Sequence, residues 1–413
     1  MVIGSAFAPL HSGKRSSIPA WVGARLCCAA ALSIAGPTFA LADESTDTSA
    51  WRWDAVYKID ALRADRPVVG TATGLFDLRL TFDAERLFGW SGTTLRVEVL
   101  GDHFGQPNRH VGSVQGISNL EVTRTSLRLY ASSIEHRFEH GTSVLFGLYD
   151  LNSDFYATEA SGLLIHPAFG IGSEFAQSGR NGPSIFPNLS LGVRVKVERD
   201  HGWYAQAAVL DAVPGDPSHP GQTRVELRAR EGALLVGELG RRTGSADSRA
   251  PDRWGIGVWN YTRSAPRLDA TGTGRDTGVY AIGQAALLER PEGRMVGFLR
   301  AGLANARLNP IDAAFDAGVL IDRPWGTSGP AALTAGIAFA RIGSTRRRLQ
   351  AAAGEQPGSH EATLELGARW MPSPSVVLQP LVQHIARVGG KAGTTATLVG
   401  VRIEWALSGG GKR

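Results

Sequence analysis

Apolar and polar residues alternate along most of the chain. In the stretch TTLRVEV (93–99), one leucine and two valines fall on one face while Arg96 and Glu98 fall on the other. Alternation with a period of two predicts β-strands with one apolar and one polar face, and about 16 or 17 such strands fit between residues 55 and 407. No stretch shows a helical period of useful length. Further examples are LGVRVKVE (191–198), VELRAR (225–230), EATLELGARW (361–370) and TATLVGVRIEWAL (395–407).

The connections between these strands are of two kinds. Short ones such as WSGT (90–93) and EHGT (139–142) contain the glycine typical of tight turns. Others are much longer, and tryptophans gather near the strand ends. These features favour an outer-membrane barrel, which turns its apolar faces to lipid. Such a barrel has long loops at one end and short turns at the other, aromatic residues at the strand ends, and charged residues on the second face of its strands. The alternative architecture is a soluble all-β sandwich or propeller, in which the apolar faces form a core.

The expected fold is therefore all-β, a 16-stranded antiparallel transmembrane β-barrel of the outer membrane. A barrel of about 16 strands leaves room for an aqueous channel, so selectivity requires a narrowing. The longest irregular connection, 151–188, contains GIGSEFAQSGRNGPSIFP (170–187). Irregular loops of this length are usually functional or disordered. We expect 151–188 to fold inward as a constriction loop; the alternatives are an external lid and a contact with a neighbouring protomer.

The first 42 residues have the layout of a secretory signal peptide. Basic residues precede the uncharged run 26–42, and small residues at its end suit cleavage. Residues 43–413 then form a single barrel domain, with strands over about 51–407 and a flexible tail at 408–413. The expected location is the bacterial outer membrane, reached by export.

Charge and cysteine content exclude several classes of function. The chain carries 43 basic and 38 acidic residues, and three of the basic residues lie in the predicted signal peptide, so the mature chain is close to neutral. This does not suit a nucleic-acid-binding protein, and we expect no nucleic-acid partner. Both cysteines also lie in the signal peptide, which leaves no disulfide in the mature chain.

Motifs for catalysis or metal binding are absent from the sequence. No GxSxG, HExxH or cysteine-based metal spacing occurs, so we expect no catalytic residue, no metal ligand and no cofactor. An outer-membrane hydrolase barrel is the enzymatic alternative. The preferred interpretation of DAVPGDP (211–217) is a turn stiffened by proline; a calcium site at Asp211 and Asp216 is the alternative.

Distinctive stretches follow one another along the chain, beginning with GLYDLNSDF (147–155), GIGSEFAQSGRNGPSIFP (170–187) and GWYAQAAVLDAVPGDP (202–217). In this order they resemble motifs of the carbohydrate-selective porins of the OprB family. The resemblance extends over nearly all of 51–405 and implies a 16-stranded barrel through which monosaccharides and related sugars diffuse. It also implies contact with outer-membrane lipid and the barrel-assembly machinery, and it fits a monomer or a homo-oligomer. Trp405 is followed by a tail, which leaves open where the assembly signal ends, and RLQAAAGEQ (348–356) has less strand character than the family. The further matching stretches are EGALLVGELG (231–240), IGVWNYT (256–262), FDAGVLIDRPWG (315–326) and LQPLVQHIARVGG (378–390).

A sugar offers many hydroxyl groups and one apolar face. A selective eyelet therefore needs hydrogen-bonding side chains and an aromatic ring. A structural role, such as satisfying loop carbonyls, is the alternative for each candidate, and a general diffusion porin without sugar selectivity is the alternative for the whole pore. The wall candidates, on the polar faces of early strands, are Arg79, Arg96, Glu98, Arg124 and Arg128, and the loop candidates are Asp154, Phe155, Glu174, Phe175, Gln177, Arg180 and Asn181.

Overall fold

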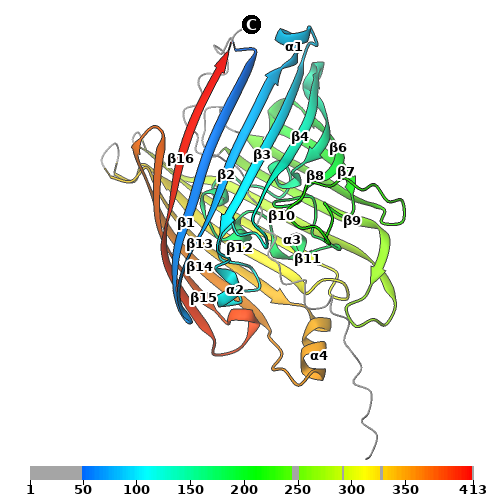
Figure 1. Ribbon diagram of the computed structural model, residues 1–413, viewed down its shortest axis with the longest axis vertical. Coiled ribbons are helices and arrows are strands. Elements are labelled where there is room, and N and C mark those ends of the chain that lie inside the picture. Colours follow the sequence, from blue (N-terminus) through cyan, green and yellow to red (C-terminus); the bar gives the residue numbers. More distant parts are fainter. Residues whose placement is uncertain (1–48, 244–250, 291–292, 326–328, 412–413) are drawn as a thin grey trace, which may run out of the picture.

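A computed structural model describes residues 49–243, 251–290, 293–325 and 329–411. Sixteen antiparallel strands, each paired with its neighbours in sequence, form one barrel that closes where β1 pairs with β16 (Figure 1). The sheet prediction is therefore confirmed, with 16 strands. They are β1 (Trp51–Asp65), β2 (Val68–Asp83), β3 (Thr93–Phe104), β4 (Ser126–Phe138), β5 (Thr142–Tyr149), β6 (Ser190–Glu198), β7 (Trp203–Asp211), β8 (Ala233–Thr243), β9 (Asp252–Pro266), β10 (Thr273–Arg290), β11 (Gly293–Ala304), β12 (Ile311–Asp322), β13 (Ala332–Ile342), β14 (His360–Ser373), β15 (Val376–Ala386) and β16 (Thr395–Gly411).

Helices are few and short, and all lie in connections. In the part of the chain that the structure describes, none is long and apolar enough to cross a membrane. The segment 348–356, which has weak strand character, begins inside the longest of them, α4. The helices are α1 (Ala84–Phe88), α2 (Asn108–Val111), α3 (Ser173–Ala176) and α4 (Ser344–Ala352), and the 3-10 turns are η3 (Glu139–Gly141), η4 (Leu151–Ser153), η5 (Ser161–Leu163), η6 (Pro167–Phe169), η7 (Asp200–Gly202) and η8 (Val388–Gly390).

The apolar face of the strands points outward. On β6, Val193 and Val195 are 39% and 40% exposed, whereas Arg194 between them is buried. Ile256 and Val258 of β9 are more than half exposed in the same way. A soluble protein places such residues inside, so this inversion identifies the outer surface as the one that faces lipid.

The two ends of the barrel differ in the length of their connections. The end where β1 begins and β16 ends also carries the connection with α1, and its described turns are short. The other end carries α2, α4 and the long connections 105–125, 150–189, 212–232 and 343–359 (Figure 1). Outer-membrane barrels have short periplasmic turns and longer extracellular loops. The long-loop end therefore corresponds to the cell exterior.

Two strand boundaries differ from the sequence analysis. The segment 225–230 alternates but is not a strand, because β7 already pairs with β8 from Trp203↔Arg241 to Asp211↔Ala233 and leaves it no partner. Residues 408–411 do not form a tail, because β16 continues through them and pairs with the start of β1. The remaining two residues of the expected tail, and the predicted signal peptide, lie outside the described residues.

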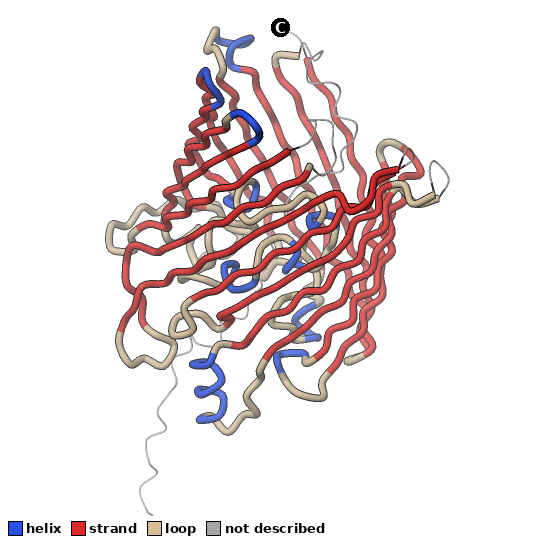
Figure 2. Tube along the Cα trace, turned by 180° about the vertical axis from the view of Figure 1, so that it is seen from behind, coloured by secondary structure: helices blue, strands red, loops and turns tan. Residues whose placement is uncertain are grey.

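The connection 150–189 lies inside the barrel (Figure 2), and apolar side chains pack it against the wall. Phe175 of α3 is fully buried and stacks on Trp259 of β9 with ring centroids 4.8 Å apart. Tyr156 stacks in the same way on Tyr280 of β10, at 4.2 Å. The barrel thus has its core between the loop and the wall, where aromatic pairs add to the burial of the rings.

We expect Phe175→Ala to lower the free energy of unfolding by about 3–5 kcal/mol, because it opens a cavity against Trp259. Urea unfolding of the barrel in lipid vesicles measures this. Phe315→Ala, at a half-exposed position on the lipid side of β12, is the matched control and should cost clearly less. Equal losses from the two variants would contradict the assignment of a core at Phe175.

Candidate functional site

Arg300 of β11 binds the inward loop at three points. Its side chain is fully buried and donates hydrogen bonds to the carbonyl oxygens of Tyr156 (3.2 Å), Ala168 (2.6 Å) and Gly170 (2.7 Å). The guanidinium charge is compensated by Asp316 of β12, at 2.7 Å. A buried ion pair is stable when its remaining hydrogen-bonding groups are also satisfied, and the loop carbonyls meet that condition here.

Carboxylates from the wall accept hydrogen bonds from the loop backbone. Glu238 of β8 accepts from the amide of Tyr156 at 3.0 Å, and Glu365 of β14 accepts from the amides of Ile165 and His166 at 2.8 Å each. All these groups are buried, so each amide needs such a partner. A segment bonded to strands as far apart as β8 and β14 lies inside the lumen, as the sequence analysis expected.

A second connection, 105–125, also folds inward. Ser113 donates to Glu361 of β14 at 2.7 Å, and Ser118 donates to Asp60 of β1 at 2.6 Å. Gln177 of the first loop donates to the carbonyl of Val114 at 2.7 Å, so the two loops contact each other. Apart from the wall candidate Arg124, no role was expected for this segment, and its length was the only signal that could have indicated that it folds inward.

An open cavity of about 860 Å³ lies on the termini side of the inward loop. Strands β1 to β9 form its walls, and residues near the start of the loop close it on the side of the long connections. The aromatic residues in its lining are Tyr130, Phe138, Tyr149 and Tyr204, of which the three tyrosines are buried. Its basic residues are Arg52, Arg79, Arg96, Arg137, Arg194, Lys196, Arg242 and Arg253, and its acidic residues are Asp54, Glu98, Glu135, Asp150, Asp154, Glu159 and Glu198.

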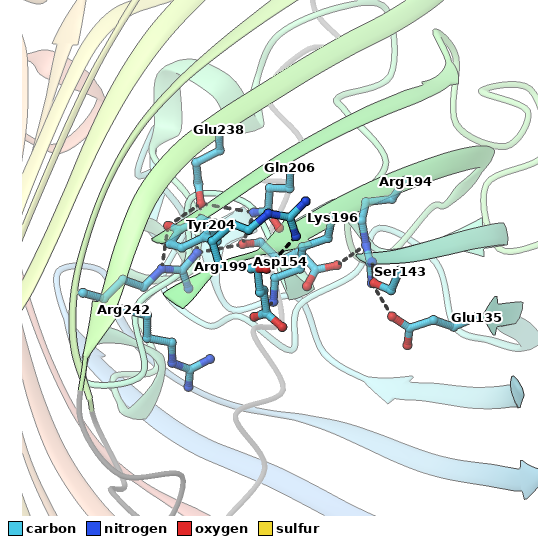
Figure 3. A network of polar contacts seen from close by, with 12 residues as sticks. Glu135, Ser143, Asp154, Arg194, Lys196, Arg199, Tyr204, Gln206, Glu238 and Arg242 are labelled. Carbon is cyan, nitrogen blue, oxygen red and sulfur yellow. Dashed lines mark hydrogen bonds and ion pairs between the residues drawn. The ribbon is translucent and has the colours of Figure 1, made fainter. Parts of the chain in front are cut away.

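Arg194 of β6 is the centre of the polar network in this cavity (Figure 3). It contacts Ser143 at 2.6 Å, Glu135 at 2.9 Å and Asp154 at 3.2 Å. Gln206 of β7 donates to the backbone carbonyl of Asp154 at 3.0 Å. These contacts join strands β4 to β7 to the start of the loop, so the loop wall and the strand wall form one rigid polar surface.

Four of the twelve candidate residues line the cavity. Arg79 and Glu98 face each other across β2 and β3 at 3.2 Å, and Arg96 lies 3.6 Å from Glu135. Asp154 is the fourth, at the start of the loop. Arg137, Arg194, Lys196 and Arg253 were not among the candidates, although the alternation in 191–198 places Arg194 and Lys196 on the polar face.

Four candidates are buried away from the cavity. Phe155 and Phe175 belong to the apolar core, and Glu174 is buried beside Tyr156, whose hydroxyl donates to it at 3.0 Å. Arg128 points inward but is held by Asp102 at 2.8 Å and by the carbonyl of Pro187 at 3.1 Å. Burial keeps these four side chains from the solute path through the cavity.

Four further candidates make local contacts. Gln177 bonds to the other inward loop, as described above. Arg180 is exposed and pairs with Glu231 at 2.9 Å, and Asn181 donates to the carbonyl of Pro214 at 2.7 Å. Arg124 was expected on the polar face of a strand, and this is wrong: it is exposed in the connection before β4, whose first residue is Ser126. Within the described residues, no group of three or more His, Cys, Asp or Glu could hold a metal ion.

The connections at the long-loop end, apart from 150–189, carry an excess of basic residues. Thirteen lysines and arginines stand against six acidic residues, and three consecutive arginines belong to α4. The basic residues are Arg66, Arg109, Arg124, Arg224, Arg228, Arg230, Arg267, Arg307, Arg346, Arg347, Arg348, Arg387 and Lys391, and the acidic ones are Glu121, Asp216, Glu226, Glu231, Asp269 and Glu355.

Comparison with known proteins identifies the family. The model of the carbohydrate-selective porin (OprB) family matches residues 70–407. The chain belongs to this family. This porin is therefore a sugar-selective channel protein of the outer membrane, and both its family and its fold are those of a channel. No curated protein matches the sequence.

Solved structures of porins share the fold. OprB of Pseudomonas putida in its high-pH structure has a TM-score of 0.74 and 14% identity, covering 86% of this chain and 94% of that one. Its low-pH structure has a TM-score of 0.52 and 13% identity, covering 86% and 92%. The anion-selective porin of Comamonas acidovorans has a TM-score of 0.54 and 12% identity, covering 87% and 100%. At these identities the likeness concerns the fold.

We expect Arg300→Gln to loosen the inward loop, because breaking a buried ion pair costs about 3–5 kcal/mol and three loop carbonyls lose their donor. Single-channel recording in planar bilayers measures this: the conductance of the variant should be larger and noisier than that of the native protein. Arg290→Gln, at an exposed position of β10 outside the cavity, is the control and should leave conductance unchanged. Unchanged conductance in folded Arg300→Gln protein would show that this anchor does not hold the loop.

The buried loop carboxyl Glu174 gives the porin a pH-dependent stability. Burial raises the pKa of Glu174 from its ordinary 4.5 to about 7. The folded protein therefore keeps a proton that the unfolded chain releases. The stabilisation is fully present below pH 4.5 and is lost as the pH rises to 7, with a magnitude on the order of 3 kcal/mol.

We expect Glu174→Gln to make the pH dependence of the free energy of unfolding shallower between pH 4.5 and 7.5 by the contribution of this one group, because the amide stays neutral at every pH. Urea unfolding midpoints in lipid vesicles measure it. Glu355→Gln, at an exposed position after α4, is the control and should keep the slope of the native protein. An identical slope in the Glu174 and Glu355 variants would contradict the assignment.

Proposed function

We propose that the loop 151–188 is the constriction of the pore, and that monosaccharides and related sugars diffuse past the polar surface of the cavity beside it. The observation that carries this proposal is the way the loop is held. Side chains from β8, β11 and β14 attach it to one side of the lumen, while the cavity remains open along β1 to β9. The inward loop is thus anchored mainly on β8 to β14, whereas the path runs along β1 to β9 past the start of the same loop.

The chemistry of the cavity suits polyhydroxylated solutes. Arginines such as Arg79 and Arg96 offer several N–H donors to hydroxyl oxygens, and carboxylates such as Glu98 and Asp154 accept from hydroxyl groups. The side chains of Arg79 and Arg96 are partly open to water, so binding stays weak enough for a solute to leave again.

Ion pairs among these residues fix their positions before a sugar arrives. Arg194 is held by two carboxylates and a hydroxyl, and Arg79 is held by Glu98. Side chains already ordered lose little conformational entropy when a solute binds. This rigidity supports discrimination among solutes by the pattern of their hydroxyl groups as well as by size.

Export and membrane assembly form the second part of the proposal. Residues 1–42 serve as the signal peptide, and the barrel-assembly machinery inserts the mature chain into the outer membrane. An outward aromatic residue near the end of β16 supports this, since Trp405 is 42% exposed on the lipid side. The strand continues to Gly411, so the assembly signal includes residues beyond this tryptophan.

We expect purified porin in liposomes to admit monosaccharides faster than amino acids of similar size, and disaccharides more slowly than monosaccharides. A swelling assay measures the three rates, with protein-free liposomes as the control. Rates that follow solute size alone would reduce the protein to a general diffusion pore. Rates equal to those of the control would show that the cavity does not connect the two sides.

A further inference from the structure

The charged groups of the cavity differ in how far they reach into it. The side chains of Arg79, Arg96 and Arg242 are 30%, 43% and 49% exposed. The carboxylates they contact are less exposed, at 10% for Glu98 and 7% for Glu135. Although basic and acidic residues are almost equal in number, the surface that a solute meets is therefore made mainly of guanidinium groups.

Arg96 keeps free hydrogen-bonding capacity. Its nearest carboxylate, Glu135, lies 3.6 Å away and is already bonded to Arg194 at 2.9 Å. Arg137, one strand further on, is exposed, and its guanidinium makes no hydrogen bond or ion pair with any described residue. Arg96 and Arg137 lie close enough to interact electrostatically. Two adjacent guanidinium groups thus share one buried carboxylate that a third arginine already compensates.

Two acidic side chains of the cavity are well exposed, unlike Glu98 and Glu135, and each of them has a basic side chain beside it. Glu198 is 57% exposed but lies 2.8 Å from Lys196, and Asp54 is 36% exposed at 3.5 Å from Arg52. Neither contacts Arg96 or Arg137 among the described ion pairs. The local excess of positive charge at these two arginines therefore remains.

The outer mouth has the same sign of charge. The connections at the long-loop end hold about two basic residues for each acidic one, with the densest group in α4. A rim of one sign raises the local concentration of oppositely charged solutes and speeds their entry, most strongly at low salt. An anionic solute is thus favoured at the mouth and again inside the cavity.

We propose that this porin prefers carbohydrates that carry an anionic group, either a carboxylate or a phosphate, and that Arg96 and Arg137 contact that group. The proposal rests on the function proposed above and names the class of sugar. Guanidinium groups bind planar carboxylates and phosphates through paired hydrogen bonds. The hydroxyl groups of the same solute contact the polar side chains that line the rest of the cavity.

The test compares the entry of three radiolabelled probes into proteoliposomes: glucose, glucuronate and glucose 6-phosphate. Glucuronate or glucose 6-phosphate should enter faster than glucose, and the faster of the two identifies the group that the arginines recognise. The double variant Arg96→Gln/Arg137→Gln should lower the ratio of anionic to neutral entry by about threefold, the scale of exposed charge contacts. In this double variant Glu135 still forms its ion pair with Arg194, so the buried carboxylate remains compensated.

Arg290→Gln is the matched control and should leave the ratio unchanged. The zero-current potential across a KCl gradient is a second measurement: it should show anion selectivity that the double variant reduces. Entry of glucose as fast as both anionic probes, or an unchanged ratio in the double variant, would overturn the preference for anions and leave sugar passage intact. Entry of all three sugars no faster than citrate would instead refute the proposed sugar function.

Discussion

The arrangement of this porin depends on the satisfaction of a loop backbone inside the barrel. A connection of nearly forty residues brings many amide and carbonyl groups into the lumen, and buried groups of this kind need hydrogen-bond partners. The wall supplies them as charged side chains: Arg300 serves three carbonyls, and Glu365 serves two amides. Without these groups the loop would have no fixed place, and the lumen no defined width.

This constraint divides the inner face of the barrel into two parts. On β10 to β15, inward polar residues mainly hold the two loops, as Glu361 and Glu365 of β14 do. On β1 to β7, many inward polar residues such as Arg79 and Arg96 line the cavity instead. Polar residues on the inner face thus serve as anchors, as part of the solute path or, like Arg194, as both. The strand that carries a residue, and the height of that residue along the barrel, decide which of these roles it has.

The division explains what the sequence can predict. Alternation fixes which strand residues point inward, so the barrel and the three candidates Arg79, Arg96 and Glu98 follow from it, whereas the inward loop and Asp154 follow from the length of the irregular connection. It cannot separate Arg96, in the cavity, from Arg128, which also points inward but is held by Asp102. That difference depends on contacts between segments far apart in the chain. The segment 225–230 is a second case. It alternates like a strand, but alternation does not show that the pairing of β7 with β8 leaves it no neighbour.

The length of the arginine side chain accounts for the charge seen by a solute. A carboxylate on a strand ends close to the wall, whereas a guanidinium on the next strand reaches further and covers it, as Arg79 does with Glu98. Each such pair is neutral as a whole but presents its N–H donors to the lumen. A wall with nearly equal numbers of both charges can therefore offer an anion-binding surface. Counting charges along the sequence would not reveal this surface, because the basic and acidic groups differ in how far they extend from the wall and not in number.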